Sequence, residues 1–218
     1  FCDQVSITST KQKMATPAEL RFQIREFLKY KKENRTPVQI AFFGGNFLGL
    51  KSEEIGSLLE LAAEFTRDGQ VDSIRCSTRP DTINERSLDM IKDYPVSTVE
   101  LGVQSMDDHV LALAGRGHSA TDTVHAVERL KERQFSIGLQ MMVGLPGDDE
   151  TSALTTAQSI ADLAPDFVRI YPTVVVTNSR LAGRYKSGDY VPMALEEGVT
   201  LVKKIYLKFK KAGIDVIR

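Results

Sequence analysis

The chain has 218 residues, enough for one sizeable hydrophobic core, and we expect residues 1–218 to form a single domain. Apolar residues make up 42% and charged residues 26%, which is the composition of an ordinary globular protein. The 28 lysines and arginines nearly balance the 29 aspartates and glutamates, so no global charge favours nucleic acid or an acidic surface. No apolar run approaches the roughly 18 residues that a membrane span needs, so we expect no membrane partner.

The only two cysteines, Cys2 and Cys76, are too few for a disulfide framework and favour a reducing, cytoplasmic location. Cys76 falls on the apolar side of an expected strand and is therefore predicted to be a buried core thiol. Cys2 stands almost at the start of the sequence, and the closing GIDVIR resembles a strand that has just begun. We therefore expect this domain to be truncated at both ends.

The helices expected along the chain have recognisable start signals. Thr16, Pro17 and Glu19 form a capping box with proline at the first helical position, and Ser119 with Asp122 forms another. Ser52 is expected to cap a further helix, and a last helix runs from about residue 195 to residue 211, before Gly213. The residues expected to face inward are Leu20, Ile24, Phe27 and Leu28 in the first helix, and Ile55, Leu58, Leu59 and Ala62 in the second.

Five strands alternate with these helices. They are expected at 38–44, 73–79, 98–104, 136–144 and 167–172. Strands that alternate with helices through short connections pair in parallel with right-handed crossovers. This pattern leaves two architectures, an open doubly wound sheet or a full or partial barrel.

The two faces of the expected strands differ, and this difference separates the two architectures. One face is apolar and the other is polar or small, whereas a sheet covered by helices on both faces should be apolar throughout. The polar or small face consists of Arg75, Ser77, Arg79, Glu100, Gly102, Gln104, Gly138, Gln140, Met142, Gly144, Arg169 and Tyr171. We therefore predict a barrel with a polar lumen, in which charged groups such as Glu100 and Arg169 must be paired or bound to a ligand.

Three short motifs stand at strand ends or at the start of the chain. Gly44–Gly45–Asn46 ends the first expected strand, and its glycines allow a sharp turn and a close approach to a ligand. The VGLPGD segment at 143–148 ends another strand, but it matches neither a dinucleotide-binding pattern nor a P-loop. FCDQ at 1–4 contains one cysteine, and one thiolate by itself holds no zinc ion or iron–sulfur cluster.

Taken in order, these motifs resemble the radical S-adenosylmethionine (AdoMet) superfamily. FCDQ resembles the end of its Cys-x3-Cys-x2-Cys loop, and GGN resembles its Gly-Gly-Glu motif. STRPD at 77–81, ELGVQS at 100–105, GRGH at 115–118 and GLQMMVGLPGD at 138–148 follow in the family's order. The nearest branches are the elongator catalytic-subunit-like proteins and oxygen-independent coproporphyrinogen oxidase. The resemblance implies an α/β fold: a partial (βα)6 TIM-type barrel of parallel strands whose first strand is missing from this chain.

The resemblance also implies roles for particular residues. Cys2 would be the third cysteine that binds a 4Fe–4S cluster, although two cluster cysteines are absent, so we expect the chain as given to be inactive. The residues expected to contact AdoMet are Phe1 through its backbone, Gly44, Gly45 and Asn46 at its amino group, and Ser77, Gln104, Arg116, Gln140 and Met142 around the rest. Asn46 replaces the commoner glutamate and offers no charge to an ammonium group.

The implied reaction is the reductive cleavage of AdoMet to a 5′-deoxyadenosyl radical, which abstracts hydrogen from a substrate. The substrate is open; transfer RNA is suggested by the branch alone, and the electron would come from a donor such as flavodoxin or ferredoxin. Two alternatives remain: a degenerate barrel that binds AdoMet without a cluster or radical activity, and a barrel enzyme unrelated to AdoMet.

Overall fold

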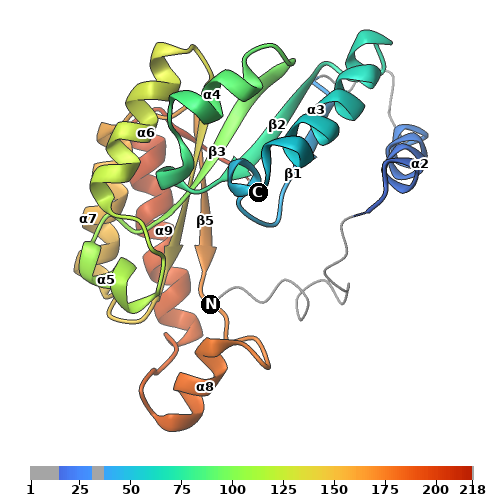
Figure 1. The fold of residues 1–218 in the computed structure, drawn as a ribbon. Helices are drawn as coiled ribbons and strands as arrows, with labels where there is room; N and C mark the ends of the chain where they lie inside the picture. Colours follow the sequence, from blue (N-terminus) through green and yellow to red (C-terminus); the bar gives the residue numbers. More distant parts are fainter. Residues whose placement is uncertain (1–14, 31–36, 218) are drawn as a thin grey trace.

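The computed structural model describes residues 15–30 and 37–217, and its strands form one parallel sheet (Figure 1). The strands follow one another across the sheet in sequence order: β1 (Gln39–Phe42), β2 (Ser73–Thr78), β3 (Val96–Gln104), β4 (Ser136–Val143), β5 (Phe167–Pro172) and β6 (Asp215–Val216). In the described part of the chain the sheet does not close, because β1 and β6 are its two edges. The predicted α/β architecture of parallel strands in sequence order is confirmed, and the closing GIDVIR segment contains the sixth strand, β6.

Helices connect each strand to the next (Figure 1). The α-helices are α2 (Pro17–Leu28), α3 (Ser52–Arg67), α4 (Glu85–Ile91), α5 (Asp108–Leu113), α6 (Ala120–Glu132), α7 (Glu150–Asp162), α8 (Arg180–Ser187) and α9 (Leu195–Lys211). Two 3-10 turns, η1 (Phe47–Gly49) and η2 (Pro80–Thr82), follow β1 and β2. Polar side chains lie at the carboxyl ends of these strands: Asn46 just before η1, and Asp81 and Thr82 within η2.

The main hydrophobic core lies between the helices and the apolar face of the strands. Side chains from α3, α4, α6, α7 and α9 pack against this face. The buried core residues within the predicted strand ranges are Ile74, Cys76, Val99, Leu101, Val103, Ile137, Leu139, Met141, Val143 and Val168. Each of them belongs to the apolar set of its strand, so the predicted alternation is confirmed, as is the burial of Cys76 (0% exposed). The other side of the curved sheet is the lumen.

Most of the expected helix boundaries are confirmed. Thr16 Oγ1 accepts the backbone N–H of Glu19 at 3.3 Å, and the Glu19 carboxylate accepts the N–H of Thr16 at 2.7 Å. Ser119 and Asp122 form the same reciprocal pair ahead of α6. The last helix ends as expected, and Gly213 after it has φ of +74°, in the left-handed region that glycine adopts without strain.

Two expectations for the first half of the chain were wrong. Ser52 is the first residue of α3 and Lys51 is its N-cap, with the Lys51 N–H bonded to Glu54 at 3.1 Å. No residue of α2 is fully buried, and Phe27 is 77% exposed. The reason is the position of α2 beside α3, away from the main helix layer (Figure 1). One partner helix can cover only part of an amphipathic stripe, so Leu20, Ile24 and Leu28 stay half-buried against a small separate cluster around Phe65.

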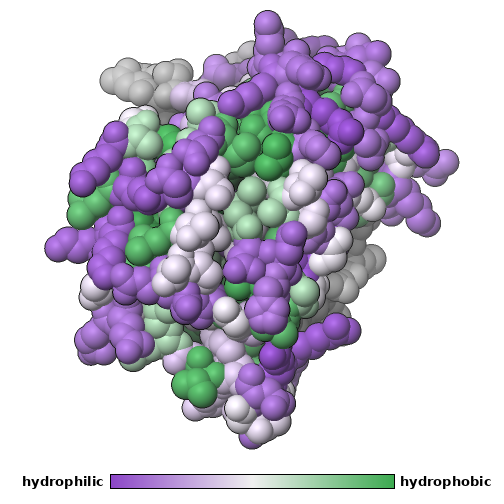
Figure 2. Space-filling model, turned by 90° about the vertical axis from the view of Figure 1, so that its left-hand side faces the viewer, coloured by the Kyte–Doolittle hydropathy of each residue, from purple (hydrophilic) through white to green (hydrophobic). Residues whose placement is uncertain are grey.

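The outer surface of the helix layer is polar. Figure 2 shows the side of the molecule on which α6 and α7 lie, and hydrophilic side chains cover most of it. In the part of the chain that the structure describes, no helix has both the length and the apolar composition needed to cross a bilayer.

Candidate functional site

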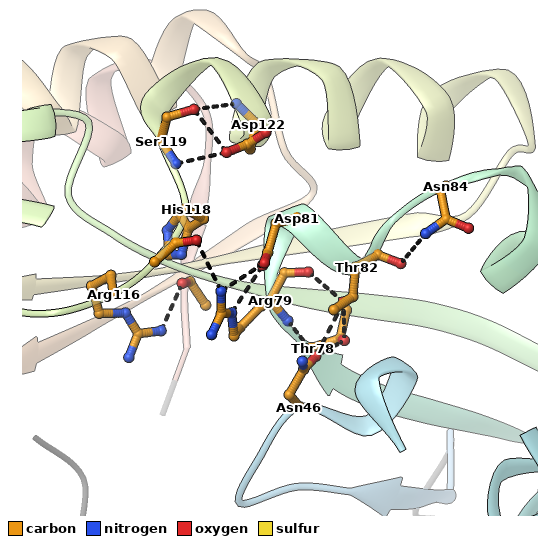
Figure 3. A network of polar contacts seen from close by, with 12 residues as sticks. Asn46, Thr78, Arg79, Asp81, Thr82, Asn84, Arg116, His118, Ser119 and Asp122 are labelled. Carbon is orange, nitrogen blue, oxygen red and sulfur yellow. Dashed lines mark hydrogen bonds and ion pairs between the residues drawn. The ribbon is translucent and has the colours of Figure 1, made fainter. Parts of the chain in front are cut away.

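The loop after β1 is fastened to the loop after β2 by Asn46 (Figure 3). Asn46 Oδ1 accepts hydrogen bonds from Thr78 Oγ1 at 2.6 Å, the Arg79 backbone N–H at 3.1 Å and Thr82 Oγ1 at 3.1 Å. The side-chain oxygen predicted to face AdoMet is therefore engaged by protein donors. An ammonium group here would have to be accepted by backbone carbonyls, because an amide nitrogen only donates.

The two glycines ahead of Asn46 leave the backbone of this loop open. Gly44 has φ of +96°, a conformation that side chains other than glycine rarely adopt. Gly44 and Gly45 are both exposed, and a Cβ added to Gly45 would meet no atom within 4 Å. The backbone of Gly44 and Gly45 is thus the part of the motif that remains available to a ligand.

Arg79 links the loop after β2 to the segment between α5 and α6 (Figure 3). Its guanidinium donates to both carboxylate oxygens of Asp81, at 2.9 and 2.6 Å, and to the backbone oxygen of Gly117 at 3.1 Å. A Cβ at Gly117 would lie 3.1 Å from Arg79 Nη2, so glycine there permits the contact. Sequence reasoning assigned no role to Arg79 or Asp81, although the charged pair two residues apart in STRPD was a usable signal.

Gln104 ends β3 in an unusual conformation. Its φ of +70° lies in the left-handed region, which costs a residue other than glycine on the order of 1 kcal/mol. The side chain is only 8% exposed, yet Oε1 has no hydrogen-bond partner among residues 15–30 and 37–217. A buried amide oxygen without a donor is destabilising, and such positions are typical of ligand sites.

Arg116 lies next to Gln104 across a glycine. Its Nη2 donates to the backbone oxygen of Gly102 at 3.2 Å (Figure 3). A Cβ at Gly102 would stand 3.0 Å from Gln104 Nε2 and 3.4 Å from Arg116 Nη2, so a larger residue would crowd both side chains. The small residue predicted for this face of β3 therefore provides the space in which Gln104 and Arg116 meet.

His118 holds the segment that carries Arg116 against β3. Its Nε2 lies 3.0 Å from the backbone oxygen of Val103, and the side chain is buried. Burial lowers the pKa of His118 below its ordinary value, and the nearby charge of Arg116 acts in the same direction, so the neutral ring is favoured. Its contact is with the backbone, so its side chain positions this segment.

Ser77 and Gln140 lie deeper in the lumen. Gln140 Nε2 donates to Glu100 Oε2 at 2.9 Å and lies 3.5 Å from Ser77 Oγ. Both side chains are buried, at 9% and 7% exposure. Met142, two residues further along β4, packs against a small apolar cluster that includes Val110 of α5. The structure thus brings Ser77 together with Gln140, and Gln104 together with Arg116, in two groups.

The centre of the lumen holds an ionic cluster, which we call the lumen cluster: Arg75, Glu100 and Arg169. Arg75 Nη2 and Arg169 Nε each form an ion pair with the Glu100 carboxylate, the second at 2.8 Å. Glu100 itself is 0% exposed. The prediction that Glu100 and Arg169 need partners is confirmed, because each is the partner of the other. Arg75 was placed on the correct face by its alternation, but its pairing was not foreseen.

The described residues fit AdoMet but not an iron–sulfur cluster. The unpartnered Gln104 Oε1, the adjacent Arg116 and the open backbone at Gly44–Gly45 offer an acceptor, a cation and a close approach. Among residues 15–30 and 37–217 no three His, Cys, Asp or Glu side chains gather as a metal site. Cys76 is buried in the core, and burial raises the pKa of its thiol to about 12, so it is no ligand. Phe1 and Cys2 lie outside the described residues.

Comparison with known proteins identifies relatives along most of the chain. The tRNA uridine(34) acetyltransferase of Methanocaldococcus jannaschii is 32% identical over 128 residues, which are 57% of this chain and 24% of that protein. Elongator complex protein 3 of Homo sapiens is 26% identical over 83% of this chain and 37% of its own length. The chain spans between 24% and 63% of the curated relatives that we compared.

Solved structures give the same fold. The Elp3 of Methanocaldococcus infernus superposes with a TM-score of 0.79 at 24% identity, over 93% of this chain and 52% of that one. Coproporphyrinogen III oxidase (HemN) of Escherichia coli, described as a radical SAM enzyme, superposes with a TM-score of 0.67 at 18% identity, over 81% and 41% of the two chains.

Two family models match consecutive parts of the sequence. The model of the radical SAM superfamily matches residues 1–160, and that of the radical SAM C-terminal domain matches residues 165–218. Together they cover nearly the whole chain, in agreement with the order of motifs and with the fold. The chain belongs to the radical SAM superfamily, whose enzymes bind a 4Fe–4S cluster and AdoMet.

Proposed function

We propose that residues 1–218 are the core of a radical AdoMet enzyme in which AdoMet binds at the carboxyl ends of the strands and the substrate binds in the lumen. The observation that carries the proposal is Gln104, whose buried Oε1 lacks a donor beside the Arg116 guanidinium. A ribose hydroxyl of AdoMet would supply that donor. When bound, the cluster and AdoMet together supply a 5′-deoxyadenosyl radical that abstracts hydrogen from the substrate.

The residues of the chain would bind and orient AdoMet. Arg116 would attract its carboxylate, as a fixed guanidinium fork does, and the backbone of Gly44–Gly45 would accept its amino group. Ser77 and Gln140 would line the space toward the substrate, with their side chains held by each other and by Glu100. Met142, Phe1 and Cys2 keep the roles that the family resemblance gives them, with Cys2 as one ligand of the cluster.

The relatives suggest a substrate class. Because a tRNA uridine(34) acetyltransferase is among the most similar proteins, we propose transfer RNA as the first substrate to test. The near balance of charges, 28 basic against 29 acidic residues, means that RNA affinity would depend on local groups or on other parts of the protein. An external reductant such as flavodoxin or ferredoxin would be the electron donor, which fits a cytoplasmic location.

The test uses the full-length protein that contains these residues. It is reconstituted anaerobically with iron and sulfide, and 5′-deoxyadenosine is measured with AdoMet and dithionite, with and without transfer RNA. We expect deoxyadenosine formation that Gln104→Ala lowers at least about tenfold, because a buried hydrogen bond to the cofactor is lost. Gln158→Ala, on the outer face of α7, is the matched control and should retain wild-type activity.

A binding measurement distinguishes the radical enzyme from the alternative, a degenerate barrel that binds AdoMet without cleaving it. Calorimetric titration of AdoMet reports affinity without any turnover. AdoMet binding that Gln104→Ala weakens, together with no cluster absorbance and no deoxyadenosine, would establish the degenerate barrel. If the protein neither binds nor cleaves AdoMet, both the enzyme and the degenerate barrel are refuted.

A further inference from the structure

The lumen cluster carries an excess of positive charge. Two guanidiniums share the single carboxylate of Glu100: Arg75 contacts Oε1, and Arg169 donates through Nε to Oε2 at 2.8 Å and through Nη2 to Oε1 at 3.4 Å. Gln140, the third partner of Glu100, is neutral and takes further acceptor capacity of the same carboxylate. Two cations and one anion leave a formal charge of one positive unit inside the barrel.

The positive part of the cluster is the part that solvent reaches. The side chains of Arg75 and Arg169 are 17% and 13% exposed, whereas that of Glu100 is fully buried. Arg75 Nε is buried and has no hydrogen-bond partner in the described parts of the chain. Arg75 Nη1 donates to Gln39 Oε1 at 3.3 Å, so Arg75 Nε is the donor that neither Glu100 nor Gln39 satisfies, in a place where an unmatched charge is costly.

Two aromatic rings border these guanidiniums. The Phe43 ring centroid lies 5.8 Å from the Arg75 guanidinium carbon and 5.4 Å from that of Arg169, and Phe167 lies 5.2 Å from Arg75. Such cation–π contacts stabilise a partly desolvated cation without cancelling its charge. Phe43 follows β1 and is 47% exposed, so it stands at the open, carboxyl end of the strands.

Phe167 covers part of the opposite end of the lumen. Phe167 is the first residue of β5, and its ring lies over Gly138, where an added Cβ would be 2.3 Å from the ring and 2.9 Å from the Glu100 side chain. The exposed Phe43 ring marks the side from which a ligand would reach the two arginines. That is also the side at which Gln104 ends β3, with Arg116 beside it.

We propose that Arg75 and Arg169 bind an oxoanion group, a carboxylate or a phosphate, of the substrate that enters the lumen. An anion there would neutralise the excess charge and take the donors that Glu100 leaves free, and guanidiniums suit planar, paired recognition of such groups. The inference rests on the proposed function, since it names a chemical feature of the substrate that the radical would attack.

The experiment measures binding of inorganic phosphate and of acetate to the whole protein, without iron or AdoMet, by titration calorimetry at fixed pH and ionic strength. Arg75→Gln and Arg169→Gln each leave one arginine paired with Glu100 and should weaken binding by about tenfold or more. Glu100→Gln raises the charge of the cluster from one to two positive units and should strengthen it. Arg133→Gln, a surface arginine bound to Glu85, is the matched control and should change nothing.

Opposite effects of the arginine and glutamate substitutions are the decisive result, because general destabilisation would weaken binding in every variant. Equal affinity in all variants, or weaker binding in a folded Glu100→Gln, overturns the proposal. Should Glu100→Gln not fold, Arg75→Lys decides, since it keeps the charge and should recover part of the affinity that Arg75→Gln loses. Binding that Arg116→Gln abolishes and Arg75→Gln leaves intact would place the anion at the strand ends and also overturn it.

The outcome is separable from that of the proposed function. Deoxyadenosine formation without phosphate or acetate binding removes the oxoanion site and keeps the enzyme. Anion binding without AdoMet cleavage keeps the site as a property of the lumen and removes the enzyme. A preference for phosphate would assign a nucleotide-like substrate, and a preference for acetate a carboxylic acid; either supports the site.

Discussion

The two faces of the sheet follow different physical rules. On the helix side, residues such as Leu101, Leu139 and Val168 are buried among other apolar side chains, and what matters is volume and hydrophobicity. On the lumen side, Glu100 on β3 depends on Arg75 from β2 and Arg169 from β5. A change on the first face is a local loss of packing, whereas a change on the second leaves partners on other strands unsatisfied.

The largest expected effect is therefore on the lumen side. Glu100→Ala removes the only carboxylate of the lumen cluster and leaves two guanidiniums close together without a counter-charge. We expect the free energy of unfolding to fall by about 3–5 kcal/mol, the usual consequence of breaking a buried pair from one side. Urea unfolding followed by circular dichroism measures it, and replacing both arginines as well (Arg75→Met, Arg169→Met) should recover much of the loss.

Leu139→Ala tests the helix side of the neighbouring strand. Leu139 is 0% exposed in the main core, and its truncation should cost about 3 kcal/mol through lost burial and the cavity left behind. The same unfolding measurement applies, and Leu139→Met should cost under about 1.5 kcal/mol because volume is nearly kept. A large loss with methionine as well would contradict the view that this face tolerates exchange.

The helix side could be predicted from the sequence because a period of two residues determines it locally. The burial of Ile74, Val99 and Leu139 could be predicted from their neighbours along the strand alone. The helix caps at Thr16 and Ser119 could be predicted from the three residues that follow each of them. The exposure of Phe27 could not be predicted, since it depends on what lies beside α2 in three dimensions.

The lumen side could be predicted in residue type but not in pairing. Alternation places Arg75, Glu100 and Arg169 on one face, yet their register, with Ser77 beside Glu100 and Gln140 beside Arg169, is a property of the assembled sheet. Asn46 shows the same limit, because the motif pointed to a ligand while the fold gives its oxygen three protein donors from the next loop.

Cys76 lies on the helix side of β2, and the pH dependence of stability tests its burial there. Its pKa is raised to about 12 by burial, with the charge of Glu100 acting in the same direction, against about 9 for an exposed thiol. The folded state therefore favours the neutral thiol. The resulting contribution to the free energy of unfolding is fully present below pH 9 and is lost as pH rises toward 12. Between these values the free energy of unfolding should fall by roughly 1 kcal/mol per pH unit more than in Cys76→Ala. Equal slopes in the two proteins would contradict the burial of this thiol.

Replacing Asn46 should lower the stability less than Glu100→Ala or Leu139→Ala does, and its main effect should be a more mobile backbone in the loop after β1. Asn46→Ala leaves Thr78, Thr82 and the Arg79 N–H without their common acceptor and should cost about 1–2 kcal/mol. Asn46→Asp keeps an acceptor and is the matched control. Hydrogen exchange of the backbone at 43–50 should speed up in the alanine variant alone; equal exchange in both variants would show that the loop is held by other contacts.

The smallest effect is expected on the outer surface. Arg133 contacts Glu85 at 2.5 Å and Asp89 at 3.5 Å, so it resembles the lumen cluster with its signs exchanged, one cation between two carboxylates. Its side chain is 34% exposed and those of its partners are 69% and 53% exposed, so water and salt screen all three charges. Arg133→Gln should lower the free energy of unfolding by less than about 1 kcal/mol, and by less still at 0.5 M salt. Both groups contain three charges and two ion pairs, so a several-fold smaller loss of stability at Arg133 would show that burial, rather than the number of ion pairs, makes the lumen cluster important. A loss as large as that in Glu100→Ala would contradict this difference between the surface and the lumen.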